Sequence, residues 1–304
     1  MMGDVTHTVG RTPMVWLRRI SAGLPGNIAA KLEMRNPSGS VKDRVALAMI
    51  EDAEERGVLR PGATIVEATG GNTGIGLAVV AAVRGYRLVL TMPESMSVER
   101  VALLRYLGTE VELTAGILMA DAVARSRQLC EEIPGAVGLD QFSNQVNPLV
   151  HRRTTGPEIW DGSQGRVVTF VSAVGTGGTL TGVGSYLRDR KPAIRIVAVE
   201  PAGAALLSGG AAGQHQVPGI GVGFIPAVLD RGLIDEVMAI TDSEAFAGAR
   251  RLAAEEGILA GPSSGAALEA AVRVASRDGS AGSVIVVLLA DSAERYVNTA
   301  LLTA

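Results

Sequence analysis

The sequence contains one cysteine, Cys130, and three scattered histidines. A single cysteine excludes an internal disulfide and any cysteine-rich zinc or iron–sulfur site. His7, His151 and His215 lie far apart and lack the short spacings of metal ligands, so the sequence offers no candidate metal site. Cys130 falls in a helical pattern over residues 120–133, where we expect a buried structural thiol.

Long apolar runs and clusters of basic charge are also absent. The longest unbroken apolar run, Val284–Ala290, is far too short to cross a bilayer. The start, Met1–Asp4, lacks the basic and then apolar regions of a signal peptide. The net charge is −3 and the basic residues are dispersed, which indicates no surface for nucleic acid or an anionic membrane. We therefore expect a cytoplasmic protein that binds neither.

The sequence is rich in apolar runs that alternate with helical patterns. Its 304 residues, 47% of them hydrophobic, suffice for two domains or one large domain. Short continuous apolar strands between helices are typical of parallel sheets covered on both faces, so we predict an α/β fold. We expect strands at residues 64–67, 87–92, 110–114, 167–174, 194–199 and 284–289, and helices at 43–56, 72–84, 98–107, 120–132, 180–190, 243–256 and 265–276.

One lysine lies in an unusual setting. Lys42 stands in the stretch Asn-Pro-Ser-Gly-Ser-Val-Lys-Asp-Arg, residues 36–44, in an expected turn just ahead of a helical pattern. Small residues before it leave room for a ligand. Together with the glycine-rich turns that follow, the stretch indicates an amine that bonds covalently to an aldehyde cofactor. Taken alone, a lysine is far more often a solvated surface charge, so the assignment depends on the other residues.

Three glycine-rich turns lie where strands end and helices begin, the usual place for ligands in such folds. Gly175–Thr179 follows an expected strand, and its glycines and helix N-terminus favour a phosphate. Leu180 stands where the third glycine of a dinucleotide fingerprint belongs, and no Walker A lysine follows. The alternative is a tight strand-to-helix turn without a ligand.

The other two turns are Thr69–Gly74 and Gly261–Gly265. In the first, backbone amides, the Asn72 amide and threonine hydroxyls are suited to a small carboxylate, although an Asn or Thr helix cap explains the same residues. In the second, serines precede an alanine-rich helix, where serine most often serves as a cap.

In this order the segments resemble the fold type II pyridoxal-phosphate enzymes, and more closely the cysteine synthase (O-acetylserine sulfhydrylase) and cystathionine β-synthase family. The resemblance rests on the lysine stretch, on Gly-Asn-Thr-Gly-Ile-Gly-Leu-Ala, on Gly-Thr-Gly-Gly-Thr and on Ser-Ser-Gly-Ala-Ala. His151–Trp160 and Gly219–Pro226 match further segments of that family. The resemblance covers the chain from about Gly10 to the C-terminus.

The resemblance implies two domains of the tryptophan synthase β-like kind, each a twisted, mostly parallel sheet flanked by helices. We expect residues 1–145 to contain the smaller, movable domain that binds the substrate carboxylate. Within them, about 13–34 cross to the other domain, and residues 146–304 form the domain that binds the cofactor phosphate. The resemblance also implies a homodimer and, as a possible partner, the C-terminal tail of serine acetyltransferase.

The resemblance further implies a role for each matching residue. Lys42 would bond to pyridoxal 5′-phosphate and later carry the α-proton. Gly175, Thr176, Gly177, Gly178 and Thr179 would bind the phosphate, Asn72 the pyridoxal 3′ oxygen and Ser263 the ring nitrogen. Thr69, Gly70, Asn72, Thr73 and Gln141 would bind the substrate carboxylate, with Gly221 near the amino end of the substrate. The implied reaction is β-replacement on O-acetyl-L-serine by sulfide, through an aminoacrylate intermediate, to give L-cysteine.

Four positions depart from the family pattern: Gly70, Ser172, Ala173 and Pro262. Gly70 replaces a common serine, which removes a hydroxyl and leaves space beside the expected substrate. Neutral drift explains these changes. The alternative is a site reshaped for a larger or more polar nucleophile, as in O-ureidoserine synthase, which uses hydroxyurea.

Two other classes of protein fit less well. A nicotinamide dehydrogenase would share the α/β pattern, but the dinucleotide fingerprint is absent and Lys42 would have no role. A non-catalytic homologue with a binding role would be expected to lose Lys42 or the phosphate turn, and both are present.

Overall fold

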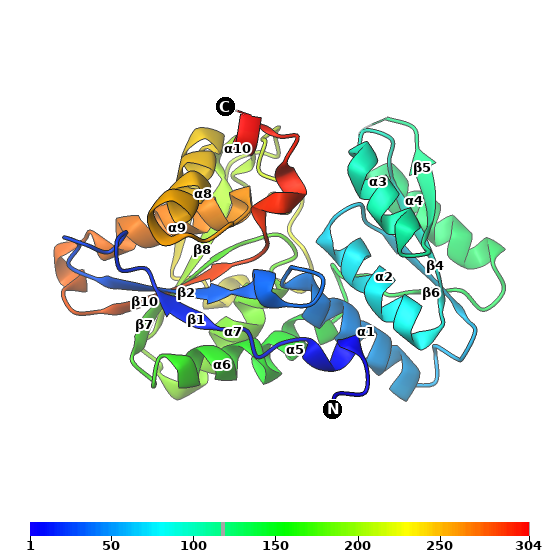
Figure 1. Ribbon diagram of the computed structural model, residues 1–304, viewed down its shortest axis with the longest axis horizontal. Helices are drawn as coiled ribbons and strands as arrows, with labels where there is room; N and C mark the ends of the chain where they lie inside the picture. Colours follow the sequence, from blue (N-terminus) through cyan, green and yellow to red (C-terminus); the bar gives the residue numbers. More distant parts are fainter. Residues whose placement is uncertain (117–118, 304) are drawn as a thin grey trace. The chain divides into compact units, whose positions relative to one another are not determined.

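The computed structural model describes residues 1–116 and 119–303. The chain forms two compact units. Unit 1 comprises Met1–Val9 and Lys42–Val146, and unit 2 comprises Gly10–Val41 and the chain from Asn147 onward. Each unit is a sheet of mostly parallel strands flanked by helices, which confirms the predicted α/β fold class (Figure 1).

The sheet of unit 2 has six strands in the order β1-β2-β10-β7-β8-β9. Only β1 is antiparallel to its neighbour. The strands are β1 (Met14–Trp16), β2 (Asn27–Leu32), β7 (Val167–Ala173), β8 (Arg195–Pro201), β9 (Glu236–Ile240) and β10 (Val284–Leu289). Every residue of β10 is buried, because helices cover both faces of the sheet.

The helices of unit 2 form two layers on its sheet (Figure 1). One layer contains α8 (Asp242–Glu256) and α9 (Pro262–Ala275), and α9 packs on β10 and β7. The other contains α6 (Thr155–Gly162) and α7 (Gly178–Arg190), with α5 (Val146–Arg153) preceding α6. Two separate apolar clusters fill the two interfaces between sheet and helices. The short α10 (Ala300–Thr303) packs on α8.

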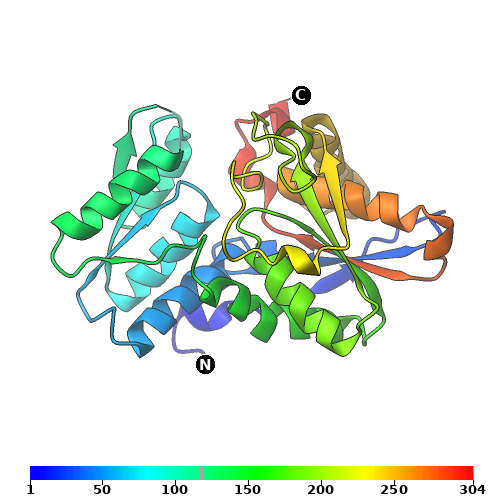
Figure 2. The same ribbon diagram turned by 180° about the vertical axis from the view of Figure 1, so that it is seen from behind.

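The sheet of unit 1 is wholly parallel, in the order β5-β4-β3-β6. Its strands are β3 (Thr64–Ala68), β4 (Arg87–Pro93), β5 (Glu110–Thr114) and β6 (Val137–Gly138). The helices are α1 (Lys42–Glu55), α2 (Asn72–Arg84), α3 (Val98–Tyr106) and α4 (Met119–Glu132). The helix α4 packs on β3 and β4, and Figure 2 shows it in front of the sheet. On the other face α2 packs on β4 and on α1.

Short 3-10 turns complete the described structure. They are η1 (Val5–Thr8), η2 (Glu33–Arg35), η3 (Ala202–Ala204), η4 (Arg231–Leu233), η5 (Asp278–Ser280) and η6 (Ala293–Tyr296). Within residues 1–116 and 119–303, no helix has the length and apolar character needed to cross a membrane.

All six expected strands and all seven expected helices are present, with ends that differ by a few residues at most. The structure adds strands β1, β2, β6 and β9 and helices α5, α6 and α10. Lys42 is the first residue of α1, so the prediction of a turn residue ahead of that helix is wrong by one position. Strand β2 has the sequence Asn-Ile-Ala-Ala-Lys-Leu, which has weak β propensity. It forms a strand because it lies between the partner strands β1 and β10.

Candidate active site

The turn Gly175–Thr179 joins the carboxyl end of β7 to α7 in unit 2. Gly177 is the N-cap of α7, in left-handed conformation with φ of 83°, and no side chain caps the helix. Within the described part of the chain, no acceptor bonds the backbone N–H groups of Gly175, Thr176 and Gly177. Thr176 and Gly177 are buried, so these donors need a partner that protein groups do not supply. A phosphate at a helix N-terminus would provide it.

Two residues that the sequence did not single out hold this turn in place. The Asn147 Nδ2 donates to Thr176 Oγ1 at 3.0 Å, and an added Cβ at Gly178 would overlap the Asn147 side chain. The fully buried His151 joins Thr155 through Nδ1 at 2.8 Å and Thr179 through Nε2 at 3.2 Å. A buried histidine with two hydroxyl partners is visible only in the fold, because sequence spacing gives no sign of them.

The loop that contains Gly221 lies against the same end of β7. The Gly221 N–H donates to Val174 O at 3.3 Å, and His215 Nε2 lies 3.1 Å from Gly221 O. An added Cβ at Gly175 would overlap the Gly219 carbonyl oxygen. Glycine at 175 therefore permits this close approach, and the structure brings Gly221 beside the phosphate turn.

The hydroxyl groups of Ser263 and Ser264 differ: that of Ser264 has a structural role, and that of Ser263 has no partner among the described residues. Ser264 Oγ accepts the N–H of Ala290 at 2.9 Å, just past the end of β10. Ser263 is 5% exposed, and its hydroxyl has no protein partner in the part of the chain that the structure describes. The N-cap of α9 is Gly261, with no side-chain bond, so the interpretation of these serines as helix caps is wrong. Pro262 occupies the first turn of α9, where proline is favoured.

Hydrogen bonds within unit 2 place Val41, the residue before Lys42, close to this serine pair. Ala290, whose N–H bonds Ser264, accepts the Val41 N–H on its carbonyl at 2.9 Å. Val41 is bonded covalently to Lys42. Val41 therefore lies at the carboxyl end of β10, the same edge of unit 2 at which Ser263 and the phosphate turn lie.

Lys42 is also the lysine best suited to bond an aldehyde, since the sequence has only three lysines. Lys31 is 1% exposed, and its amine donates to Glu158 at 2.6 Å and to Thr12 O at 2.5 Å. Lys191 donates to Val167 O at 3.0 Å, at the amino end of the sheet. Lys191 is therefore far from the carboxyl edge, whereas Lys31, the next-to-last residue of β2, has an amine that already bonds Glu158 and Thr12.

Unit 1 gathers the predicted carboxylate-binding residues at the carboxyl end of its own sheet. Thr69 follows β3, and its Oγ1 accepts the Gly71 N–H at 3.2 Å. Thr73 Oγ1 donates to Gln141 Oε1 at 2.6 Å, which joins two segments 68 residues apart. Asn72 is the first residue of α2, and Gly71 is the N-cap without a side-chain bond. The interpretation of Asn72 as a helix cap is therefore wrong.

The space expected beside Gly70 is occupied by a methionine. An added Cβ at Gly70 would lie 2.9 Å from Cγ and from Sδ of Met96, and 3.3 Å from Met92 Cβ. The sequence predicted that loss of the usual serine leaves room near the substrate. The Met96 side chain fills that room, so Gly70 does not enlarge the site.

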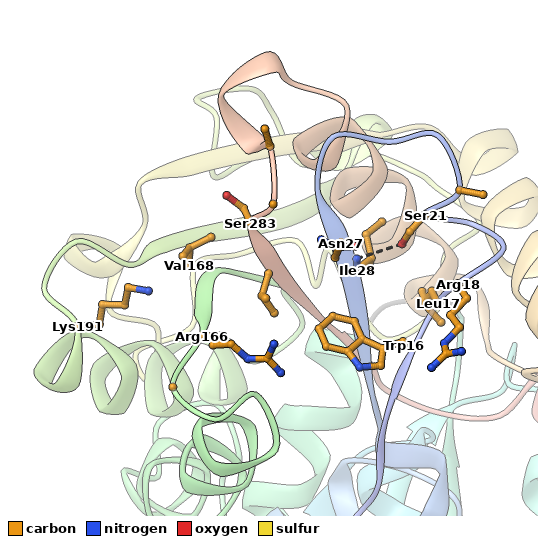
Figure 3. A pocket seen from close by; sticks show the side chains of 15 residues that line it. Trp16, Leu17, Arg18, Ser21, Asn27, Ile28, Arg166, Val168, Lys191 and Ser283 are labelled. Atoms are coloured by element: carbon orange, nitrogen blue, oxygen red, sulfur yellow. Dashed lines mark hydrogen bonds between the residues drawn. The ribbon is translucent and has the colours of Figure 1, made fainter.

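A cavity of about 1040 Å³ in unit 2 lies elsewhere. Its lining includes Trp16, Arg18, Arg166 and Lys191, at the amino ends of the sheet strands, and none of the predicted site residues (Figure 3). Arg166 extends toward Trp16, with its guanidinium carbon 5.9 Å from the ring centroid. Its Nε donates to Ser163 O at 3.2 Å. This cavity has no part in the chemistry predicted at the opposite edge.

These features meet the needs of pyridoxal phosphate, which requires donors for its phosphate, an amine for its aldehyde and a partner for its ring nitrogen. Within unit 2, the unbonded amides of Gly175–Gly177 fit the first need and the buried Ser263 hydroxyl fits the third. The residue before Lys42, Val41, lies at the same edge of that unit. Within the described residues, no group of three His, Cys, Asp or Glu side chains could hold a metal ion.

Comparison with known proteins gives the same class. A family model described as "Pyridoxal-phosphate dependent enzyme" matches residues 5–291. The chain is 50% identical to cysteine synthase A of Escherichia coli (strain K12), over 98% of this chain and 94% of that protein. The chain therefore belongs to the pyridoxal-phosphate dependent enzyme family.

Two solved structures are similar throughout. Cysteine synthase from Entamoeba histolytica superposes with a TM-score of 0.96 at 38% identity and covers 100% of this chain and 91% of its own. An O-ureido-L-serine synthase superposes with a TM-score of 0.95 at 44% identity, covering 99% and 95%. The expected resemblance to cysteine synthases is confirmed.

Proposed function

We propose that this enzyme catalyses β-replacement on O-acetyl-L-serine, with sulfide as the acceptor, and so forms L-cysteine. The observation that carries the proposal is the position of Val41, the residue before Lys42, at the carboxyl end of β10 beside the Ser263–Ser264 pair. The identity of about half of all residues with a cysteine synthase, over nearly the whole chain, supports the choice of reaction.

Each residue predicted from the sequence then has a role in this proposal. The backbone of Gly175–Thr179 binds the cofactor phosphate, Ser263 faces the ring nitrogen, and Asn72 reaches the 3′ oxygen. The residues that bind the substrate carboxylate are Thr69, Gly70, Asn72, Thr73 and Gln141, and Gly221 lies near the substrate amino end. We assign these carboxylate residues to a domain that closes on the substrate and excludes water.

Pyridoxal phosphate supplies an electron sink for the carbon from which a proton leaves. The Lys42 amine takes the proton from the α-carbon of the amino acid, and acetate leaves from the β-carbon. Sulfide then adds at the β-carbon, and the proton returns from Lys42 to the α-carbon. A serine hydroxyl at the ring nitrogen does not enforce protonation as an aspartate would, which suits elimination better than a long-lived carbanion.

Sulfide is a better acceptor for this site than hydroxyurea. One ground for a reshaped site was extra room at Gly70, and Met96 occupies that room. The 50% identity to the E. coli cysteine synthase, over 98% of this chain, also supports sulfide as the acceptor. The two solved structures superpose almost equally well, so the acceptor, rather than the overall shape, distinguishes a cysteine synthase from an O-ureido-L-serine synthase.

The test of the acceptor is a direct competition. The purified enzyme with O-acetyl-L-serine receives sulfide, hydroxyurea or both, and the amino-acid products are quantified by mass spectrometry. We expect cysteine to form faster than O-ureidoserine at equal acceptor concentrations. Faster formation of O-ureidoserine would move the enzyme to the hydroxyurea reaction.

Three further predictions follow from the family alone. They are a homodimer, a cytoplasmic location and an association with the C-terminal tail of serine acetyltransferase. Size-exclusion chromatography with light scattering, and titration with a peptide of that tail, are the measurements that check the first and the third.

A further inference from the structure

Glu67 is a buried carboxyl group to which the proposed reaction gives no role. It lies in β3 of unit 1, two residues before Thr69, and is 5% exposed. A buried carboxylate loses much of its hydration and persists only where other groups compensate. Its location, at the end of the strand that leads into the carboxylate-binding loop, raises the question of what the carboxylate holds.

Three consecutive backbone groups donate to this side chain. The N–H groups of Leu139 and Asp140 bond Glu67 Oε2 at 3.2 and 2.9 Å, and the Gln141 N–H bonds Oε1 at 3.2 Å. These donors follow β6, which pairs with β3 in parallel. Bonds from N–H groups to an ionised carboxylate are stronger than those to a neutral acceptor. Glu67 therefore fixes the backbone of this segment from the strand beside it.

The segment that Glu67 holds needs such support. Asp140 has a φ of 48°, a left-handed conformation that is unfavourable for a residue with a side chain. The next residue, Gln141, is buried, and its side-chain oxygen accepts the Thr73 hydroxyl at 2.6 Å. A shift of the backbone at Asp140 would move Gln141 away from Thr73. Both residues belong to the set proposed to bind the substrate carboxylate.

We propose that Glu67 is a positioning residue for the amino-acid substrate: its carboxylate fixes the backbone of Leu139–Gln141 and so holds Gln141 beside Thr73. Glu67 itself does not touch the substrate. This inference rests on the proposed function, since it concerns the affinity of the same site for its donor.

Protonation of Glu67 changes the number of bonds that it accepts. Burial raises the pKa of Glu67 to about 7, even though the N–H groups of Gln141, Asp140 and Leu139 oppose that rise and the charge of Asp140 adds to it. From α4, Cys130 faces the same carboxyl group, and the pKa of this thiol is raised by burial and then by the Glu67 charge. A proton fits most readily on Oε1, which accepts a single bond, and it displaces the Gln141 N–H. The three hydrogen bonds to Glu67 therefore hold the backbone of residues 139–141 above about pH 7, and fewer of them hold it below that pH.

The variant Glu67→Gln tests the proposal because an amide has the shape of the protonated carboxyl group. In the cofactor-loaded enzyme we expect the KM for O-acetyl-L-serine to rise about tenfold, the effect of one lost buried hydrogen bond. We expect kcat to stay within about twofold, because donor binding rather than the chemical step is affected. The wild-type KM should rise as the pH falls through about 7, and that part of the pH dependence should be absent from the variant.

Glu200→Gln is the matched control. Glu200 is 2% exposed at the end of β8 in unit 2, and it accepts the N–H groups of Leu207 and Ser208 at 2.7 and 2.9 Å. Like Glu67, Glu200 is a buried carboxyl group that accepts backbone N–H groups of a loop, but that loop contains no proposed site residue. We expect its KM for O-acetyl-L-serine to equal that of the wild type.

Amide hydrogen exchange at residues 139–141 is the readout besides activity. Exchange there should be faster in Glu67→Gln than in the wild type and unchanged in Glu200→Gln. An unchanged KM in Glu67→Gln, or an equal rise in both variants, would overturn the proposal. If Glu67→Gln does not fold, Glu67→Asp replaces it, and we expect a raised KM that still depends on pH; a wild-type KM in this variant would overturn the proposal.

Failure of the proposed function is distinguishable from failure of this inference. A wild-type enzyme that does not turn over O-acetyl-L-serine contradicts the proposed function, while hydrogen exchange at residues 139–141 still tests the support by Glu67. A wild-type enzyme that is active beside a Glu67→Gln variant with unchanged KM contradicts the inference alone.

Discussion

Replacing Lys42 with alanine is expected to lower turnover by about a thousandfold or more while the fold persists. The amine of Lys42 is the group proposed to take the α-proton, and the structure offers no substitute. Lys31 is buried in its contact with Glu158, and Lys191 lies at the amino end of the sheet. Steady-state assays with O-acetyl-L-serine and sulfide measure the loss, and circular dichroism checks the fold.

Lys191→Ala is the control for this experiment. It removes the same functional group, together with one hydrogen bond to Val167 O, at a cost of about 1 kcal/mol in stability. We expect its turnover to match the wild type. Wild-type turnover in Lys42→Ala, or an equal loss in both variants, would contradict the assignment of Lys42.

Replacing Gly178 with alanine is expected to weaken binding of pyridoxal phosphate by about tenfold to a hundredfold, because overpacking costs about 1–3 kcal/mol. The added Cβ would overlap the side chain of Asn147, which bonds Thr176 in the phosphate turn. Asn147 is fully buried and bonds Thr176, so we expect the overlap to displace the turn. Equilibrium dialysis of the cofactor measures the change in affinity.

The same helix supplies the matched control. At Gly184 an added Cβ would lie 3.6 Å from the nearest atoms of Ile196, an ordinary contact. Alanine is favoured over glycine within a helix by about 1 kcal/mol, so Gly184→Ala is expected to bind the cofactor normally and to unfold at equal or higher urea concentration. Equal cofactor affinity in both variants would show that the close approach at Gly178 does not matter for the phosphate turn.

Local signals explain which elements the sequence could predict. The helix α2 begins at Asn72 and ends at Arg84, as expected, because Gly85 takes the left-handed C-cap conformation with φ of 72°. The turns Thr69–Gly74 and Gly175–Thr179 were equally visible, since glycines between a strand and a helix leave a direct trace in the sequence. The two turns that were also read as possible helix caps have glycine caps instead.

Features that depend on distant partners could not be predicted. The Ala-Ala-Lys segment of β2 gives little strand signal, and its lysine is buried only because Glu158 lies beside it. For the same reason, the contact of His151 with Thr179 and the bonds from residues 139–141 to Glu67 were missed. The donors to Glu67 are more than 70 residues further along the chain, so its role appears only once β3 and β6 are paired.

The most direct test of the central claim is the visible absorption spectrum of the purified enzyme before and after addition of O-acetyl-L-serine. We predict a yellow protein whose visible band comes from pyridoxal phosphate bonded to Lys42, a change of that band with the donor, and its return on addition of sulfide. A yellow protein whose spectrum does not respond would contradict O-acetyl-L-serine as the donor. A protein that stays colourless with added pyridoxal phosphate would contradict the cofactor site itself.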